Sequence, residues 1–328
     1  MAGKWRTARI LMLVSGGILL AILVWSNDPE AILASIRQLS WRLLVVILFP
    51  FSVVNVLDTL GWRFAFRHDR VPFGALFSAR MAGEAFNLTT PTASVGGEAV
   101  KAWLIRHHVP LDEGLSSVIV AKTTITIAQG LLLVVGLPAA WALLPHDSPL
   151  LTAMLWLLVA EILAVAGFVA VQVTGVLGRG GRALGRLAFL DKLAGGLGRL
   201  DDSLAEFYRR EPRRLALSTF FHFLGWLASG LEVWVVLHLL GIDISLGAAL
   251  LVEAFSTAVR FATFMVPASI GALEGGHVAI FTALGFGGTV GMSFSLVRRI
   301  REATWIGVGF ILLAAYRGWV PAPAPERG

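Results

Sequence analysis

Residues 150–173 read LLTAMLWLLVAEILAVAGFVAVQV, and Glu161 is the only charged residue among them. A helix needs about 20 mostly apolar residues to cross the ~30 Å hydrocarbon core of a bilayer, and this run is long enough. Two more runs, LLVVILFPFSVVNVL at 43–57 and LLLVVGLPAAWALL at 131–144, approach that length together with their flanks. The sequence therefore predicts an all-helical, polytopic membrane protein.

The composition of the whole chain supports this class. Of its 328 residues, 56% are hydrophobic and 15% are charged, and the mean hydropathy is +0.77. Soluble domains usually contain about 25% charged residues. The chain has no cysteine, which excludes disulfides, thiol catalysis and cysteine-ligated metals. We interpret the net charge of +6 as basic loops beside anionic lipid head groups, and we expect no nucleic-acid partner.

Hydropathy predicts about eight membrane segments, two of which are interrupted. The first apolar run is interpreted as a retained helix, because no small-residue cleavage site follows Trp25. The uninterrupted spans are predicted at 8–26, 42–62, 115–144, 150–176, 214–240 and 302–319, and the interrupted stretches at 72–106 and 246–297.

The segment 178–213 is polar, with more Lys and Arg than Asp and Glu, and is therefore predicted to be cytoplasmic. Its leucines recur every three or four residues, which predicts an amphipathic helix on the membrane surface; a solvated linker is the alternative. The connections at 145–149 and 241–245 contain no Lys or Arg and are predicted to lie outside. The basic cluster at 298–301 fits neither side clearly, so the orientation of 246–301 stays open.

An approximate internal repeat links the two interrupted stretches. Each copy contains Glu-Ala-Phe, a proline, Ala-Ser-(Val/Ile)-Gly and a glutamate in this order, at 84–98 and again at 253–274. Duplicated halves with broken hydrophobic segments are a sequence indication of a transporter's binding site. We therefore predict two related halves, 42–176 and 214–319, with a broken or re-entrant helix in each.

The glycine-rich break at 91–97, PTASVGG, precedes a short basic helix. The N–H groups of a helix's first turn can bind an anion, and Ser94 could cap this turn or donate to a phosphate oxygen. Glu98 could close the cap by bonding back to the backbone, and Lys101 could hold a phosphate or carboxylate. The alternative is an ordinary helix N-cap with a basic end.

Charged residues within apolar segments are expensive in lipid and usually functional. Arg80, Glu84 and Asn87 are spaced to share one helical face, and Glu253 and Arg260 repeat the pairing of acid and base before the second break. A cavity with both charges suits a zwitterionic or polar head group. The alternative is a structural ion pair that holds two half-helices together.

Other ionisable residues are assigned less specific roles. Lys122 either lines the pathway or extends to the membrane surface, and Asp58 is expected at the interface. Glu161 is the deepest isolated acid and is expected to be the partner of a nearby cation. His222 and His277 are interpreted as packing residues, as is Glu232. No H-E-x-x-H or G-x-S-x-G pattern is present.

Two motifs give the chain a resemblance to a known family. FNLTTPTASVGGEAVKAWLIRHH (86–108) and VPASIGALEGG (266–276) resemble the lysylphosphatidylglycerol synthase transmembrane family, a flippase-like membrane domain, and the likeness extends over essentially the whole chain. LDTLGWRFAF (57–66) is similar to a subgroup associated with hopanoid metabolism. The family-like positions are Asn87, Pro91, Gly96, Gly97, Glu98, Lys101, Pro267, Ser269, Gly271 and Glu274.

The resemblance implies lipid movement across or between membranes, in a bacterial inner membrane. Bifunctional relatives carry an aminoacyl-transferase domain after the helices, and we expect that synthase activity to be absent here. Thr89 and Thr90 are less typical of the family, so the head-group preference of relatives is not transferred.

The leading hypothesis is therefore a transporter for a polar-headed or hopanoid-type lipid. The alternatives are an intramembrane lipid-modifying enzyme and a non-catalytic subunit of a lipid pathway. Membrane lipids are the expected partners, with a homo-oligomer or lipid-pathway proteins also open; no cofactor and no metal are expected. The predicted substrate-binding residues are Arg80, Glu84, Asn87, Ser94, Gly96, Gly97, Glu98, Lys101, Lys122, Glu253, Arg260, Ser269, Gly271 and Glu274.

Overall fold

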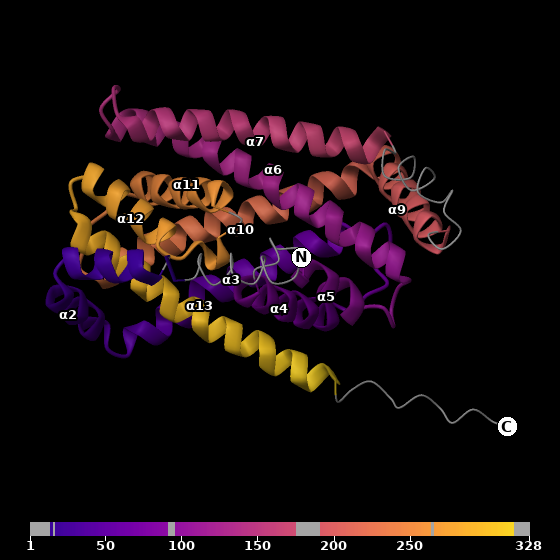
Figure 1. Cartoon of the computed structure of the whole chain (residues 1–328), viewed down its shortest axis with the longest axis horizontal. Coiled ribbons are helices and arrows are strands. Elements are labelled where there is room, and N and C mark those ends of the chain that lie inside the picture. The colour runs from indigo at the N-terminus through magenta and orange to yellow at the C-terminus, as the bar shows by residue number, and fades with distance from the viewer. Residues whose placement is uncertain (1–13, 16, 91–95, 175–190, 264–265, 318–328) are drawn as a thin grey trace.

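The computed structural model describes residues 14–15, 17–90, 96–174, 191–263 and 266–317, and every element in them is helical (Figure 1). A short helix, Gly17–Ser26, comes first. The others are α2 (Pro29–Leu39), α3 (Arg42–Phe64), α4 (Phe73–Thr89), α5 (Gly96–Leu104), α6 (Leu111–Leu143), α7 (Pro149–Thr174), α9 (Asp191–Arg210), α10 (Pro212–Leu239), α11 (Leu246–Ala262), the 3-10 turn η2 (Pro267–Ser269), α12 (Ala272–Ala283) and α13 (Gly288–Arg317).

Among the described residues, four helices are long and apolar enough to cross a bilayer: α3, α6, α7 and α10. A fifth span is possible if Gly17–Ser26 and α2, which meet at 91°, are counted as one broken segment. These helices confirm a polytopic membrane protein, and the four long ones lie where the uninterrupted apolar runs predicted them.

Local sequence explains where several helices begin and end. The side chain of Asp28 accepts a hydrogen bond from Ala31 N at the start of α2, and Ser245 caps α11 through Ala248 N. Pro212 opens α10 at a position where its missing N–H removes no helical bond. After α12 the chain turns through Gly285 and Gly287, whose φ angles of 82° and 86° favour glycine.

The helices form a bundle in which each interrupted stretch packs against the other half of the chain. α3 and α10 make the most extensive contact. α4 packs on α13, α11 packs on α6, and η2 lies against α4. α7 covers one side of α6 and leaves most of its own surface exposed (Figure 1). The second break in the chain therefore lies beside the helix that leads into the first.

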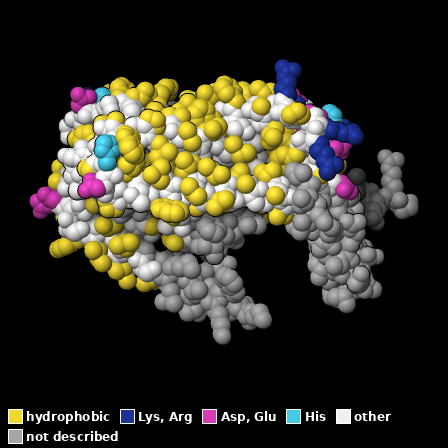
Figure 2. Space-filling model, turned by 90° about the horizontal axis from the view of Figure 1, so that it is seen from above, with side chains coloured by type: hydrophobic (Ala, Val, Ile, Leu, Met, Phe, Trp, Pro, Cys, Tyr) yellow, Lys and Arg dark blue, Asp and Glu magenta, His cyan; other side chains and the backbone are white. Residues whose placement is uncertain are grey.

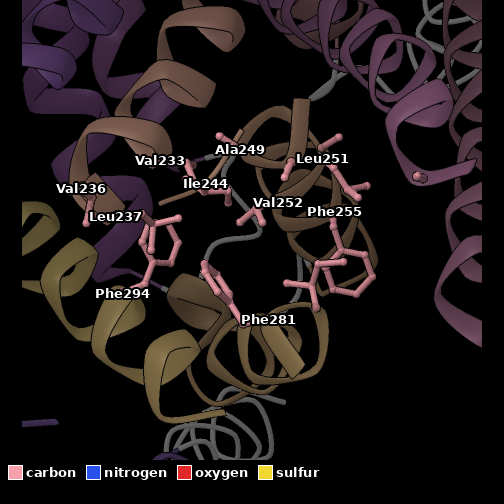
Figure 3. Close-up of a cluster of buried hydrophobic side chains, with 14 of the residues drawn as sticks. Val233, Val236, Leu237, Ile244, Ala249, Leu251, Val252, Phe255, Phe281 and Phe294 are labelled. Carbon is pink, nitrogen blue, oxygen red and sulfur yellow. The ribbon is translucent and has the colours of Figure 1, made fainter. Parts of the chain in front are cut away.

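The apolar core of the second half is built from α10, α11, α12 and α13 (Figure 3). Phe281 and Phe294 pack with their ring centroids 5.4 Å apart. Small and branched side chains of α10 and α11, such as Val233 and Ala249, fill the space around them. This core fixes α11 and α12 relative to α13, which matters because these helices carry most of the buried charges described below.

The two ends of the bundle differ in charge. On the face in Figure 2, hydrophobic side chains cover the middle, and Lys and Arg gather at one end only. At this end the α3–α4 connection is tied to α9 and α10, because Arg67 bonds Glu206 through two contacts of 2.6 and 2.9 Å and Arg214 contacts Asp69 at 2.6 Å. The α6–α7 connection, which contains no Lys or Arg, lies at the opposite end (Figure 1).

Two expectations need correction. The last predicted span, 302–319, is the second part of a longer helix, α13, which begins at Gly288. Consequently Arg298, Arg299 and Arg301 lie in the middle of that helix. In addition, the apolar side chains described on α9, including Leu204 and Phe207, pack into the protein core, so they do not face lipid; residues 178–190 lie outside the described part of the chain.

Candidate functional site

Ionisable and amide side chains gather in two groups, one near each interrupted segment. The first polar cluster comprises Asn55, Asp58, Arg80, Glu84, Asn87, Glu98, Lys101, Lys122 and His222. The second polar cluster comprises Glu232, Glu253, Arg260, Glu274, Arg298, Arg299, Arg301 and Glu302.

Lys101 joins the two half-helices of the first break. Its ammonium group donates to Glu84 of α4 at 2.6 Å and to Glu98 of its own helix at 3.1 Å. The Lys101 side chain is 9% exposed. A buried ammonium group that is shared by two carboxylates holds α4 and α5 together.

Asn87 supplies a second link across the same break. Its Oδ1 accepts a hydrogen bond from Gly97 N at 2.9 Å, and its Nδ2 donates to Glu98 at 3.2 Å. The expectation that Gly97 N–H is available to a ligand is therefore wrong, because Asn87 caps α5 from α4. Glu98 bonds Asn87 and Lys101 instead of closing the cap itself. Ser94 lies outside the described residues.

Gly83 and Gly97 allow the two half-helices to meet at their backbones. A Cβ atom at Gly97 would clash with the carbonyl oxygen of Gly83 and with the Asn87 side chain. A Cβ atom at Gly83 would lie 2.7 Å from the carbonyl oxygen of Gly97. Both positions therefore require glycine. Gly97 is the second glycine of the Gly-Gly pair in the sequence motif, and this contact explains why glycine stands there.

We expect Gly97→Ala to lower the free energy of unfolding by about 1–3 kcal/mol, as overpacking usually does. The added methyl group must push α4 away from α5 and displace the cap that Asn87 provides. Thermal unfolding in detergent measures the effect. Gly167→Ala on α7 is the matched control, because nothing lies within 4 Å of a Cβ atom there. Equal stability of the two variants would contradict the close approach.

Arg80 points away from Glu84, its predicted neighbour on the same helical face. It donates to Asp58 at 2.5 Å and to Asn55 at 2.7 Å, both on α3. Asp58 also accepts from His222 of α10 at 3.1 Å. Asp58 is therefore a buried member of the site.

A cavity of about 50 Å³ lies within the first polar cluster. Its polar lining comprises Asp58, Arg80, Glu84, Glu98, Lys101, Lys122 and His222. The Lys122 side chain is 51% exposed and lies 3.9 Å from Glu98. Lys122 thus lines the cavity at its accessible edge, which favours the first of its two predicted roles.

The second break is a short irregular segment between α11 and α12. Ala268 and Ser269 both have a φ of 49°, in the left-handed region that is unfavourable for residues with a side chain. Ser269 accepts a hydrogen bond from Thr263 at 2.9 Å, and Gly271, with a φ of 82°, donates its N–H to Glu274 at 2.7 Å. Glu274 therefore caps α12 in the way that was predicted for Glu98.

α13 connects the two half-helices of the second break. Arg299 donates to Glu274 of α12 at 2.5 Å and to Glu302 at 2.8 Å, and Glu302 accepts from Arg260 of α11 at 2.7 Å. The link runs from α12 through α13 to α11. The ion pairs of the first break join its two half-helices directly, whereas those of the second run through a third helix, and a buried hydrogen bond of 2.8 Å between Ser256 and His277 also joins α11 to α12.

The remaining arginines of α13 bind acids of α10 and α11. Arg298 forms two hydrogen bonds to Glu253, at 2.7 and 3.3 Å, and lies 3.8 Å from Glu232. Arg301 is in direct contact with Glu232, which has no exposed side-chain surface. Glu253 and Arg260, which were predicted as one acid–base pair, therefore belong to different ion pairs on α13.

Charge is balanced within each cluster. The first contains three carboxylates and three cations, besides His222, and the second contains four of each. The clusters differ in access, since Glu84 and Lys122 reach the surface and Glu232, Glu253 and Arg301 do not. The cluster members that sequence reasoning missed are Asn55, Asp58, His222, Glu232, Arg298, Arg299, Arg301 and Glu302.

Comparisons with known proteins extend over nearly the whole chain. The family model described as "Lysylphosphatidylglycerol synthase TM region" matches residues 10–310. A "UPF0104 membrane protein" of Methanothermobacter thermautotrophicus (strain Delta H) is 24% identical over 310 residues, which cover 88% of this chain and 90% of the relative. No solved structure matches. Neither match supports the hopanoid-associated subgroup.

Proposed function

Since the chain belongs to the lysylphosphatidylglycerol synthase TM region family, we propose that it moves a polar-headed lipid across or between membranes. The observation that carries this proposal is the cavity of the first polar cluster, lined by three carboxylates, three cations and a histidine beside a broken helix of a membrane bundle. Irregular backbone at membrane depth is tolerated where protein buries it or where it lines a polar cavity.

The charges of the cavity favour a head group that is zwitterionic or polar over one with a large net charge. Each cation already has a carboxylate near it, so a head group must replace existing ion pairs with its own. A volume of about 50 Å³ holds a few water molecules, at about 10–15 Å³ for each, and is small for a lipid head group. In this proposal a head group therefore enters when α4, α5 and α6 separate.

The internal repeat is part of the proposal and is supported by the order of helices. In both halves a long helix (α3, α10) precedes a broken pair (α4 and α5, α11 and α12) and a second long helix (α6, α13). The contacts correspond as well, because α4 packs on α13 and α11 packs on α6. In such an arrangement the first polar cluster is the accessible site and the second is its closed counterpart.

The proposal predicts that reconstituted protein redistributes fluorescent lipid between leaflets faster than protein-free vesicles do. Lipids with zwitterionic, anionic and uncharged head groups distinguish the substrate classes. A rate equal to that of protein-free vesicles for every lipid would contradict the proposal. We place the protein in the cytoplasmic membrane of a bacterium, although the relative described above is archaeal.

We expect Lys122→Ala to slow lipid redistribution by about tenfold, equivalent to about 1.4 kcal/mol in the barrier. Lys122 is the most exposed cation of the cavity, and its contact with Glu98 is long, so the head group meets it first and the fold depends on it little. Arg210→Ala is the control, because it removes one exposed positive charge at the α9 end. Equal rates in the two variants would remove Lys122 from the pathway.

One observation favours a second candidate, an intramembrane lipid-modifying enzyme. His222 Nδ1 bonds Asp58, and among the described residues nothing bonds the buried Nε2. This is the arrangement of a histidine base that is oriented by a carboxylate, and both residues line the cavity. Lipid mass spectrometry of a deletion strain separates the candidates, since a missing modified lipid indicates an enzyme and unchanged lipid chemistry indicates transport. A non-catalytic subunit would copurify with stoichiometric partners.

A further inference from the structure

Glu161 lies near the middle of α7, the helix with the most exposed surface among the membrane spans. At 1.5 Å per residue it is roughly 18 Å from either end of the 26-residue helix. The chain contains no other charged residue between 149 and 174. Neither polar cluster includes Glu161, so the proposed lipid site leaves it without a role.

Protein atoms alone bury this carboxyl group. Glu161 is 1% exposed, and both of its oxygens are buried without a hydrogen-bond partner among the described residues. It lies against α6 near Gly130, where a Cβ atom would be 3.9 Å from the carboxyl carbon. The neighbouring Gln129 does not compensate it, because Gln129 Nε2 is also without a partner. The cation that was expected to pair with Glu161 is therefore absent from the described surroundings.

Among the side chains that the structure describes, no ionisable group on α6, α9 or α11, the helices packed against α7, balances a charge at Glu161. Lys122, the cation of α6, is displaced from Gly130 by roughly 12 Å along the helix. Glu253 and Arg260 of α11 bond to α13. None of the ionisable side chains described on α6, α9 and α11 bonds Glu161. They are Asp112, Glu113, Lys122, Asp202, Glu206, Tyr208, Arg209, Arg210, Glu253 and Arg260.

We infer that Glu161 is a proton-binding site, protonated while α7 lies against α6, and that its ionisation requires this part of the α6–α7 interface to open. An isolated carboxylate in an apolar interior is costly enough that the group takes up a proton instead. α7 is also the span with the least buried surface, so its contact with α6 is the one most readily opened. The ligand of this site is the proton, and the inference does not depend on lipid movement.

Labelling with dicyclohexylcarbodiimide tests the protonated state in the full-length protein in phosphatidylcholine vesicles. The carboxyl O–H adds across one C=N bond of this apolar reagent, and the product rearranges to a stable N-acylurea, so the peptide gains the mass of one reagent molecule. We expect the adduct at Glu161 at pH 7 and none in Glu161→Gln. Glu232 is the internal control, because it is equally buried but bound to Arg301. Absence of the adduct at Glu161, or equal labelling of Glu232, would overturn the inference.

Hydrogen–deuterium exchange tests the opening of the interface. After correction for intrinsic rates, exchange of peptides around Gly130 and Glu161 should increase between pH 6 and pH 9 in the wild type, roughly tenfold for each 1.4 kcal/mol by which the closed state is weakened. Glu161→Gln, which stays neutral, should show no such increase. A merely structural Glu161 would give the same pH response in both proteins, and this result would refute the opening.

Discussion

Replacement of Arg301 by alanine is expected to lower the free energy of unfolding by about 3–5 kcal/mol, the usual result of removing one partner of a buried ion pair. Glu232 would remain with no exposed side-chain surface and with Arg298 as its only other cation, at 3.8 Å. Arg298 cannot move freely toward Glu232, because two hydrogen bonds hold it to Glu253. The guanidinium group of Arg301 also lies over the ring of Phe51, at 3.9 Å from its centroid, so this contact is lost too.

Thermal and denaturant unfolding in detergent would measure this loss. The double variant Arg301→Leu with Glu232→Leu should recover most of the stability, since two apolar side chains leave no buried charge without a partner. Arg210→Ala removes an exposed arginine from an ion pair on α9 and should change stability by less than about 0.5 kcal/mol. If Arg301→Ala were as stable as Arg210→Ala, Glu232 would have to be neutral or hydrated in the folded protein.

The uninterrupted helices could be predicted from sequence because one local property determines them. A window of about 20 apolar residues is sufficient evidence for a span, and α3, α6, α7 and α10 all contain one. The breaks between α4 and α5 and between α11 and α12 were visible for an equally local reason, because proline and glycine interrupt a helix wherever they occur in numbers. The spans and their interruptions follow from short stretches of sequence.

The ion pairs could not be predicted in the same way, because their partners lie far apart in the sequence. Spacing placed Arg80 and Glu84 on one helical face, but Arg80 bonds Asp58 on α3 and Glu84 bonds Lys101 on α5. Periodicity identifies neighbours within one helix and contains no information on which helix packs beside it. The capping glutamate was predicted in the first copy of the motif, at Glu98, and is found in the second, at Glu274, whereas Asn87 caps the first.

The arginines of α13 show a second limit of hydropathy. Three arginines, at 298, 299 and 301, lower the hydropathy of α13. For this reason α13 is not among the spans that length and composition identify. In the folded protein each has a carboxylate partner on α10, α11 or α12, so their charge is neutralised inside the bundle. The sequence does contain an indication of these partners, because other apolar segments carry a matching set of acids, Glu232, Glu253 and Glu274.

The two clusters place different demands on the protein if the proposed transport is correct. In the second, the Arg298–Glu253 and Arg301–Glu232 pairs are almost fully buried, so opening this part of the cluster requires the separation of buried charges. In the first, Glu84 and Lys122 are partly exposed, and water can replace lost contacts as the helices move. Lys101 of the first cluster, like Arg80 and Asp58, is buried, and it has two carboxylate partners. A substitution of Lys101 should therefore change both the stability of the protein and the rate of lipid redistribution.

We expect Lys101→Met to reduce the rate of lipid redistribution by at least about tenfold, equivalent to 1.4 kcal/mol or more in the barrier. Methionine preserves most of the length of the side chain but removes the ammonium group that joins Glu84 to Glu98. The two carboxylates would then face the cavity without their shared cation, and α4 would lose its strongest link to α5. Lys101→Arg, which retains the charge, should keep a larger part of the activity.

A double variant separates the structural from the functional contribution of Lys101. Adding Glu84→Gln to Lys101→Met removes a carboxylate that lost its partner, so the melting temperature should recover in part. The rate of lipid redistribution should remain low, because the cation that a phosphate or carboxylate of the head group would meet is still absent. Recovery of both quantities would show that Lys101 only holds α4 and α5 together, and wild-type rates in a folded Lys101→Met would exclude this cavity as the lipid pathway.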